Sequence, residues 1–210
     1  MSISIVNGRL IDPAHNIDDH LDLHIDDSQI VAIGDAPAEF TADEVIDAHD
    51  SVVCPGLVDL AASLREPGHE HKGRLSSETA AAARGGITTL LCTPDTPPVI
   101  DNTAVVELIH RLARKLGQAR VLTTGALTQG LEGELLSEMA ALKSVGCVAM
   151  SNAQHPLAST LVERRALEYA TTFGLTVFLR PEDRHLRAGG CCHEGAVSAR
   201  RGFSENSQGC

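Results

Sequence analysis

From Pro55 onward, apolar strand-like segments alternate with segments of helical periodicity, and this alternation constrains the fold more than any other feature. The five strand-like segments read GLVDLAAS, GITTLLCT, ARVLTTGAL, GCVAMS and GLTVFLR. The segments between them read ETAAAARGG, NTAVVELIHRLARKLG, ELLSEMAALKSVG and STLVERRALEYATTFG. Nearly continuous apolar strands that alternate with helices are typical of a parallel sheet covered by helices. The sequence therefore predicts an α/β architecture after Pro55.

The predicted helices carry recognisable end signals. Residues 101–103 (Asp-Asn-Thr) offer side-chain oxygens for an N-cap, just before an apolar face with i, i+3, i+4 spacing. Gly117, Gly146 and Gly174 stand where a glycine commonly ends a helix. These signals strengthen the assignment of helices between the strands.

Five parallel strands fit either an open doubly wound sheet or the front part of a (β/α)8 barrel, which has eight strands and typically about 250 residues. Either arrangement leaves two sheet edges with unpaired backbone groups. We favour an incomplete (β/α)8 TIM-type barrel over residues 55–200, with about five of the eight strands present. The chain then ends in RGFSENSQGC, which is polar and without periodicity, so we expect an aberrant or disordered tail over 201–210.

Residues 1–54 have a different pattern, with short strand-like segments and no helical periodicity. The short strand patterns SISIV, LDLHI, IVAIG and EVIDA are separated by the turn signals NG, DD, GD and AP. This predicts a small β-rich N-terminal domain. We interpret DPAHNIDDHLD, at residues 12–22, as a solvated loop and strand edge.

The composition limits the partners and the core. Asp and Glu number 28 against 17 Lys and Arg, which argues against nucleic acid or an anionic membrane as a partner. With one Tyr, four Phe and no Trp, the core must consist mainly of Ala, Leu, Val and Ile. The N-terminus lacks the pattern of a signal peptide, and there is no apolar run of membrane-spanning length. We therefore expect a cytoplasmic protein.

Six cysteines occur without a C-x-x-C pair. Cys54, Cys92 and Cys147 lie in or beside apolar strand-like runs. We interpret these three as reduced, buried thiols in a cytosolic protein.

Chemistry in a parallel barrel lies at the carboxyl ends of the strands, and the first such end is unusual. It reads LAASLREPG, with Ala61 and Ser63 two positions apart and hence on one face of the strand. Two imidazoles at that spacing could converge on one metal. A methyl group and a hydroxyl group are not competent zinc ligands.

Three motifs in the same order extend this observation: PGLVD-x-x-x-x-LREPG, then ETAAAARGGITTLLCTPDTPP, then GALTQGLEGELLSEMAALKSVGCVAMSN. Together they resemble the class I dihydroorotases of the amidohydrolase superfamily, over nearly the whole chain to about Arg200. The resemblance implies an N-terminal β domain followed by a metal-dependent TIM barrel.

The resemblance also implies functional positions near the first two strands. The family has a metal-binding His-x-His at the end of the first strand, where this sequence has Ala61 and Ser63. The family's arginine that binds the substrate carboxylate is matched by Arg65. In the Pro-Asn-Thr run that follows the second strand, the asparagine is replaced by Asp95, whose charge would repel an anionic substrate.

The later strand ends depart from the family in the same way. Where the family has Ser-Asp-Asp-Gly with its metal-bridging acid, residues 151–154 read Ser-Asn-Ala-Gln, so Asn152 and Ala153 supply no acid. Where the family has His-Ala-Glu-Asp, residues 180–183 read Arg-Pro-Glu-Asp, and the Arg180 guanidinium cannot bind a cation. The last histidine ligand and the catalytic aspartate of the family belong to later strands, which the 210 residues lack.

We therefore expect no catalytic residue, no bound metal and no cofactor. Arg65 is left as a vestigial substrate anchor, which either pairs with a nearby acid such as Glu66 or Asp95 or still binds an anion. The helix caps and glycines of the fold persist while the ligand positions have changed, and this contrast favours a surviving non-catalytic role.

Non-catalytic dihydroorotase-like chains act in some bacteria as partners of aspartate carbamoyltransferase. The resemblance thus implies a structural subunit required for assembly and activity of that transferase, in a hetero-oligomer with its catalytic chain, in pyrimidine biosynthesis. The alternative is a divergent metal-dependent cyclic-amide hydrolase with a site rebuilt from His69, His71 and Glu182. A third hypothesis is a product without a stable fold.

Other polar groups are interpreted as structural. His15, His20 and His24 in the β-rich domain are expected at the surface or a strand edge, and CCHE at 191–194 is expected to be local loop structure. Two basic groups are expected to form solvated helix faces: Arg111 with Arg114 and Lys115, and Arg164 with Arg165.

Overall fold

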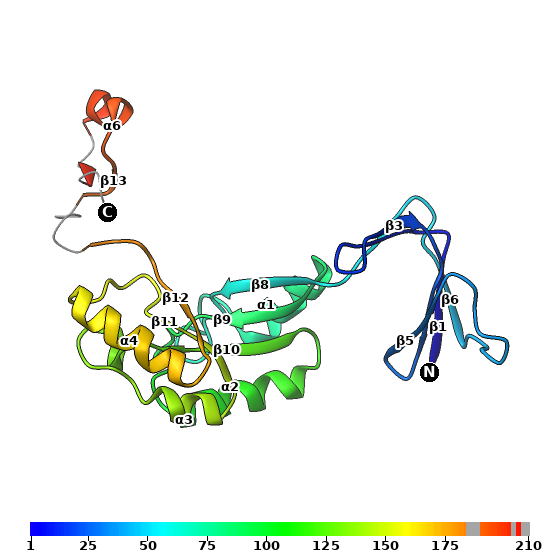
Figure 1. The fold of residues 1–210 in the computed structure, drawn as a ribbon, viewed down its shortest axis with the longest axis horizontal. Helices are drawn as coiled ribbons and strands as arrows, with labels where there is room; N and C mark the ends of the chain where they lie inside the picture. The colour runs from blue at the N-terminus through cyan, green and yellow to red at the C-terminus, as the bar shows by residue number, and fades with distance from the viewer. Residues whose placement is uncertain (184–189, 203–204, 207–210) are drawn as a thin grey trace. The chain divides into compact units, whose positions relative to one another are not determined.

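A computed structural model describes residues 1–183, 190–202 and 205–206 (Figure 1). The chain divides into two compact units, Met1–Gly56 and Leu57–Cys210. Each unit is built differently, the first from small β-sheets and the second mainly from alternating strands and helices.

The first unit contains two small sheets. The four-stranded sheet has the order β5-β4-β1-β6, and its strands are β1 (Ser2–Val6), β4 (Leu23–Asp26), β5 (Gln29–Ile33) and β6 (Glu44–Asp47). The three-stranded sheet has the order β3-β2-β7, and its strands are β2 (Arg9–Asp12), β3 (Ile17–His20) and β7 (Val52–Val53). A β-rich fold for this segment is what the turn-separated strand patterns predict.

The interpretation of residues 12–22 as a solvated loop and strand edge is confirmed: residues 13–16 are exposed, and β3 is an exposed edge strand that pairs antiparallel with β2. Asn16 has a φ of 56° in the turn between the two strands, a left-handed conformation that asparagine tolerates better than most residues. The Arg9 guanidinium also binds the Asp18 carboxylate across the pair, at 2.7 Å and 2.8 Å. The turn at Asn16 and the Arg9–Asp18 ion pair together stabilise a hairpin in a polar stretch of sequence.

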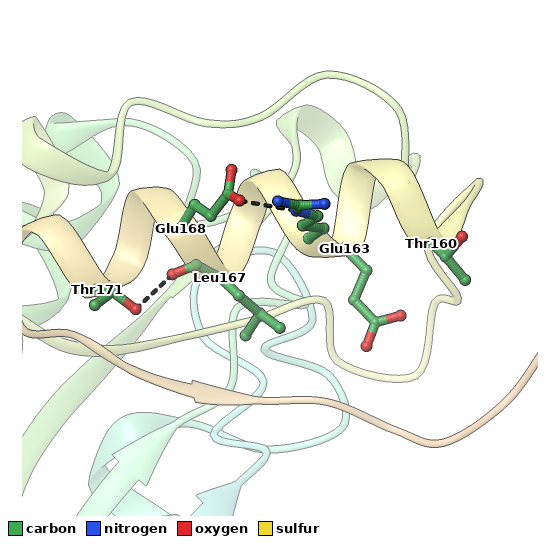
Figure 2. Close-up of a pocket in the computed structure, with 6 residues that line it drawn as sticks. Thr160, Glu163, Leu167, Glu168 and Thr171 are labelled. Carbon is green, nitrogen blue, oxygen red and sulfur yellow. Dashed lines mark hydrogen bonds and ion pairs between the residues drawn. The ribbon is translucent and has the colours of Figure 1, made fainter.

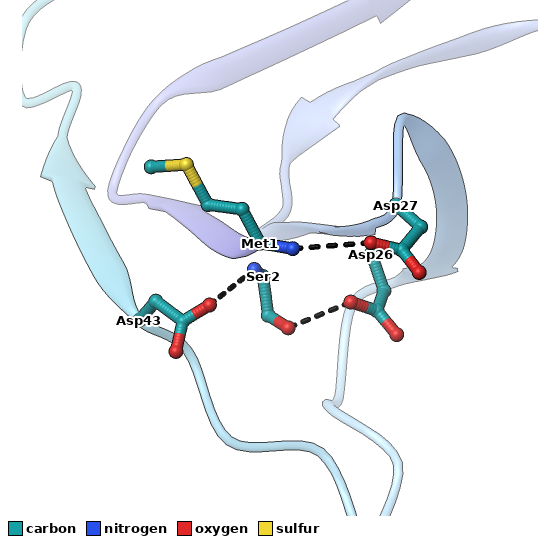
Figure 3. Close-up of polar contacts among 5 residues, drawn as sticks. All are labelled: Met1, Ser2, Asp26, Asp27 and Asp43. Atoms are coloured by element: carbon teal, nitrogen blue, oxygen red, sulfur yellow. Dashed lines mark hydrogen bonds and ion pairs between the residues drawn. The ribbon is translucent and has the colours of Figure 1, made fainter.

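Aspartates surround the first residue of β1 (Figure 3). The amino group of Met1 donates to Asp27 at 3.1 Å, and the Ser2 hydroxyl donates to Asp26 at 2.7 Å. The backbone N–H of Ser2 donates to Asp43 at 2.8 Å. These contacts attach the chain start to the turn after β4 and to the segment before β6.

The second unit contains a five-stranded sheet of order β12-β11-β10-β9-β8. Its strands are β8 (Leu57–Ala62), β9 (Ile87–Cys92), β10 (Arg120–Ala126), β11 (Cys147–Ser151) and β12 (Thr176–Phe178), and all four pairings are parallel. The strands lie side by side in chain order, as in a (β/α)8 barrel, whereas a doubly wound sheet reverses direction at a switch point. The incomplete barrel with five strands is therefore confirmed.

Four helices connect these strands: α1 (Leu75–Arg84), α2 (Thr103–Leu116), α3 (Met139–Ser144) and α4 (Thr160–Thr172). Each packs against the strand that follows it in the chain. The predicted caps of α2 are confirmed, since Asn102 accepts a hydrogen bond from the Val105 N–H at 3.3 Å and Gly117 is left-handed with φ 62°. Gly146 and Gly174 also have positive φ just after α3 and α4.

Helix α3 is shorter than predicted. Residues 134–138 do not join it, because their backbone groups bind the loop that follows β10. Leu127 accepts from the N–H of Ser137 at 3.0 Å, and Leu135 accepts from the N–H of Gln129 at 2.8 Å. A short 3-10 turn, η1 (Gln129–Leu131), completes this loop.

The core between sheet and helices is aliphatic, as predicted, with Leu90, Ile109 and Met150 all buried. Cys92 and Cys147 are buried free thiols, but Cys54 is exposed and its predicted burial is wrong. Burial raises the pKa of the Cys92 thiol to about 12 and also raises the pKa of Cys147. Both thiols are therefore inert core residues near neutral pH.

Near the end of the chain, β13 (Cys192–His193) pairs in parallel with β14 (Glu205–Asn206), and α6 (Ala196–Arg201) lies between them. Most of the tail predicted over 201–210 falls outside the described residues. No helix in the described parts of the chain is long and apolar enough to cross a membrane.

The two edge strands of the large sheet are β8 and β12. On β8 the side chains of Leu57, Val58 and Leu60 are each 57% exposed. An exposed, apolar edge strand with unpaired backbone groups can pair with another chain, as expected from the sequence for a five-stranded sheet.

Candidate functional site

The carboxyl ends of the parallel strands are where a barrel of this kind performs chemistry. A cavity of about 620 Å³ lies at the ends of β11 and β12 and at the first turn of α4. Its polar lining includes Asn152, His155, Ser159, Arg180 and Glu182. The sequence-predicted positions are described below in chain order.

At the end of β8, side chains alternate between the core and the solvent. Ala62 and Leu64 are 8% and 2% exposed, whereas Ala61 and Ser63 are exposed. The pair at 61 and 63 therefore shares one face, as its spacing predicts. That face presents a methyl group and a hydroxyl group, which do not hold zinc.

Arg65 follows in a left-handed conformation with φ 64° and is half-buried. The predicted ion pair with Glu66 or Asp95 is wrong: within the described ranges, no acidic oxygen lies within 4.0 Å of the Arg65 guanidinium. Glu66 instead accepts a hydrogen bond from the Leu75 N–H, at 2.7 Å, at the start of α1. A carboxylate at a helix N-terminus is a favourable arrangement, and it gives Glu66 a partner other than Arg65.

Asn152 is 3% exposed, and its amide is fully used in local contacts. Its Oδ1 accepts from the Thr128 hydroxyl at 2.7 Å. Its Nδ2 donates to the carbonyl oxygens of His155 and Leu131, at 3.0 Å and 3.4 Å. A buried polar group must find such partners, and here the amide holds together the loops after β10 and β11. A carboxylate at this position would face two carbonyl oxygens.

Arg180, after β12, makes two side-chain contacts. Its guanidinium donates to Oε1 of Gln154 and forms an ion pair with Glu182, with 2.9 Å between Nη2 and Oε2. The Glu182 side chain is only 5% exposed. Arg180 thereby links the loop after β11 to the segment after β12, and places a positive charge where the resemblance implies a metal ligand.

The remaining acid–histidine candidates do not converge. The rings of His69 and His71 meet edge to face at 5.8 Å in the loop after β8. In the described part of the chain, no three His, Cys, Asp or Glu side chains are arranged to hold a metal ion. A site rebuilt from His69, His71 and Glu182 is therefore wrong, and the donor set at the strand ends does not fit the metal centre implied by the resemblance.

Of the three histidines that the sequence places at the surface or a strand edge, His15 and His20 are exposed as expected, and His24 is not. His24 is 5% exposed rather than at the surface. Its Nδ1 lies 2.9 Å from the Ser4 hydroxyl and its Nε2 lies 3.0 Å from the Gly34 carbonyl oxygen. The carbonyl can only accept, so Nε2 carries the proton and Nδ1 accepts from Ser4. This buried histidine is a structural residue.

A surface hollow of about 650 Å³ runs along α4 and is lined by residues of that helix alone (Figure 2). Arg164 and Glu168 form an i, i+4 ion pair there at 2.8 Å, and the Thr171 hydroxyl donates to the Leu167 carbonyl. These are ordinary contacts of a solvated helix face.

Residues 50–209 match the family model described as dihydro-orotase-like. The chain belongs to this dihydroorotase-like family. A dihydroorotase-like protein of Pseudomonas aeruginosa is 52% identical over 204 residues, which are 97% of this chain and 48% of that protein. A dihydroorotase of Geobacter metallireducens is 43% identical over 203 residues, again 97% of this chain and 48% of the relative. This dihydroorotase-like chain thus spans about half the length of the curated relatives it matches.

Solved structures share the fold of this dihydroorotase-like chain. The L-hydantoinase (dihydropyrimidinase) from Arthrobacter aurescens superposes with a TM-score of 0.76 at 19% identity, covering 89% of this chain and 42% of that one. A crystal structure of a dihydroorotase superposes with a TM-score of 0.60 at 16% identity, covering 85% and 50%. At such identities the likeness concerns the fold alone, and it supports the partial barrel.

Proposed function

We propose that this chain is a catalytically inactive dihydroorotase homologue that serves as a structural subunit of aspartate carbamoyltransferase in pyrimidine biosynthesis. The observation that carries the first half of this proposal is the chemistry of the strand ends. Ala61 and Ser63 offer no zinc ligand, and the Asn152 amide donates to backbone carbonyl oxygens. Arg180 carries a positive charge.

Hydrolysis of a cyclic amide in this family depends on a metal that turns water into hydroxide near neutral pH. A catalytic zinc site needs about three protein ligands from His, Asp, Glu or Cys. A guanidinium with a full positive charge would also repel a divalent cation. The described strand ends therefore lack the means to hold the metal.

Two features support a retained structural role. The helix caps, the glycine turns and the aliphatic core are intact, so the frame is kept although the ligand positions have changed. Relatives at 52% and 50% identity also carry the name dihydroorotase-like protein. The transferase as partner rests on the resemblance of the sequence to non-catalytic chains of that assembly.

Two measurements on the full chain test the proposal. Purified protein should contain no stoichiometric zinc and should not hydrolyse dihydroorotate. When co-expressed with the catalytic chain of aspartate carbamoyltransferase from the same organism, it should co-elute with it on size exclusion. Deleting its gene should abolish assembly of the transferase. A transferase that assembles and works unchanged without this chain would refute the structural role, and zinc-dependent turnover would refute the inactivity.

A further inference from the structure

A separate cavity, of about 480 Å³, lies where α2 ends and β10 begins. It is at the amino-terminal side of the strands, away from the strand ends described above. The lining comprises His110, Ala113, Arg114, Gly117, Gln118, Ala119, Arg120, Val121 and Leu122. Its volume falls within the range of small-molecule sites, roughly 300–1,000 Å³.

The charge of this cavity is opposite to that of the protein. The chain carries a formal net charge of −11, yet the nine lining residues include Arg114 and Arg120 and no acid. Within the described ranges, neither guanidinium has an acidic oxygen within 4.0 Å. Two arginines without an acidic partner among the described residues therefore line one hollow.

The turn at Gly117 brings the two arginines together. Gly117 adopts a left-handed conformation that ends α2. Arg114, on the last turn of α2, and Arg120, the first residue of β10, therefore line the same cavity. A Cβ placed on Gly117 would meet no atom within 4 Å, which shows open space at the turn. Gln118 is held in place by a hydrogen bond with the Thr79 hydroxyl at 3.0 Å.

Buried apolar side chains form part of the wall, with Ala113, Ala119 and Val121 each 7–8% exposed. Low-polarity walls strengthen the interaction of a bound anion with nearby cations. The carboxyl end of α2 contributes only about half a negative charge, which the two arginines outweigh.

His110 is a partly buried residue of the lining. Its Nε2 is 3.2 Å from the Thr123 hydroxyl, which in turn is 3.5 Å from the Cys147 sulfur. Burial, together with the positive charge of Arg114, lowers the pKa of His110. The imidazole is therefore neutral near pH 7 and sensitive to a charge that enters the cavity.

We propose that the cavity between α2 and β10 binds a small oxyanion, a phosphate or carboxylate group, through the guanidinium groups of Arg114 and Arg120. Guanidinium groups present paired N–H donors that match both kinds of anion. The apolar wall would contact the rest of the ligand. This site is independent of the inactive strand ends and of the transferase partner proposed above.

Calorimetric titration of the full chain with inorganic phosphate, sulfate and acetate at constant ionic strength tests this site. We expect saturable binding of at least one anion, and the preferred anion distinguishes a phosphate ligand from a carboxylate ligand. R114Q and R120Q should each weaken that binding by about tenfold, since each removes a charge-assisted contact. R111Q is the matched control, because Arg111 is an exposed arginine on the same helix outside the lining, and it should change the affinity less than twofold.

A second readout is the ring signal of His110 in NMR titrations against pH, assigned with H110Q. A saturating concentration of the preferred anion should raise the pKa of His110 in the wild type and leave it unchanged in R114Q/R120Q. Absence of saturable binding for all three anions would overturn the proposal. A loss of affinity in R111Q equal to that in R114Q and R120Q would also overturn it, because the binding would then reflect general surface charge and not this cavity. Both arginines are exposed, so the thermal unfolding midpoints of R114Q and R120Q should stay within a few degrees of the wild-type value. Such midpoints would exclude misfolding as the cause of weaker binding.

Discussion

Arg180 and Glu182 form an ion pair of 2.9 Å in which the acid is almost fully enclosed, at 5% exposure, while the arginine remains 47% exposed. A buried carboxylate requires a counter-charge or donors, because its loss of hydration is costly. Arg180 also reaches Gln154, so one cation ties together the segments after β11 and β12. In this chain the Arg180 guanidinium therefore joins the two strand ends, at the position where the resemblance implies a metal ligand.

The first prediction concerns that pair. Arg180→Met should lower the free energy of unfolding by about 1–3 kcal/mol, less than for a fully buried pair because Arg180 is half-exposed. Urea denaturation measures the change. Glu182→Gln in the same chain should recover part of the loss.

The matched control for this experiment is Arg164→Met, which breaks the exposed pair with Glu168, at 77% and 61% exposure. Its effect should stay within about 0.5 kcal/mol. Equal losses at the two positions would show that the enclosure of Glu182 has no energetic consequence.

The second prediction concerns Asn152. Asn152→Asp should destabilise the protein by about 1–3 kcal/mol, because the new carboxylate would face the carbonyl oxygens of His155 and Leu131 without a donor. Thermal or urea unfolding measures this. The same substitution at Asn16, an exposed residue in the turn after β2, is the control, and it should be nearly neutral because aspartate also tolerates the left-handed conformation there. Equal tolerance at both positions would contradict the hydrogen-bond assignment.

The third prediction concerns the first strand end. Restoring histidine in Ala61→His/Ser63→His should produce neither stoichiometric zinc nor dihydroorotate turnover. Two imidazoles are too few ligands, and the other strand ends still present Asn152 and Arg180. Metal analysis and a hydrolysis assay of the double variant measure both properties. Measurable turnover would show that the rest of the site is competent.

The fourth prediction concerns pH. The pKa of His110 is lowered in the folded protein, so the unfolded chain binds more protons through this residue as the pH falls below about 6.5. The stability contributed by a neutral His110 should therefore be fully present well above that pH and decline as the pH falls through about 6.5 toward 5. The difference between wild type and His110→Gln in urea midpoints, measured across this window, isolates the effect. A difference that stays constant across this window would contradict the lowered pKa of His110.

Local patterns were sufficient for much of the fold. Asn102 and Gly117 cap α2 as predicted, since capping depends on contacts within a few residues. The chain order of β8 to β12 follows from the strand–helix alternation. The sequence predicts a strand edge within residues 12–22 but not its pairing with β2, because Arg9 and Asp18 meet across a turn in a polar segment that lacks strand periodicity. Helix α3 was predicted too long, because residues 134–138 satisfy their backbone groups on the loop after β10.

The sequence by itself determined the parallel strand–helix frame, the helix caps and the absence of ligand side chains at 61, 63, 152 and 180, because these are properties of residue identity and short-range spacing. Only the tertiary structure decided that Arg65 is without an acidic partner among the described residues, that Glu182 is enclosed beside Arg180, and that Arg114 shares a cavity with Arg120. These relationships depend on the distances and burial that arise when separate loops and elements pack together. Adjacency in the sequence does not fix such distances. Glu66, next to Arg65 in the chain, therefore binds the N-terminus of α1 instead of the arginine.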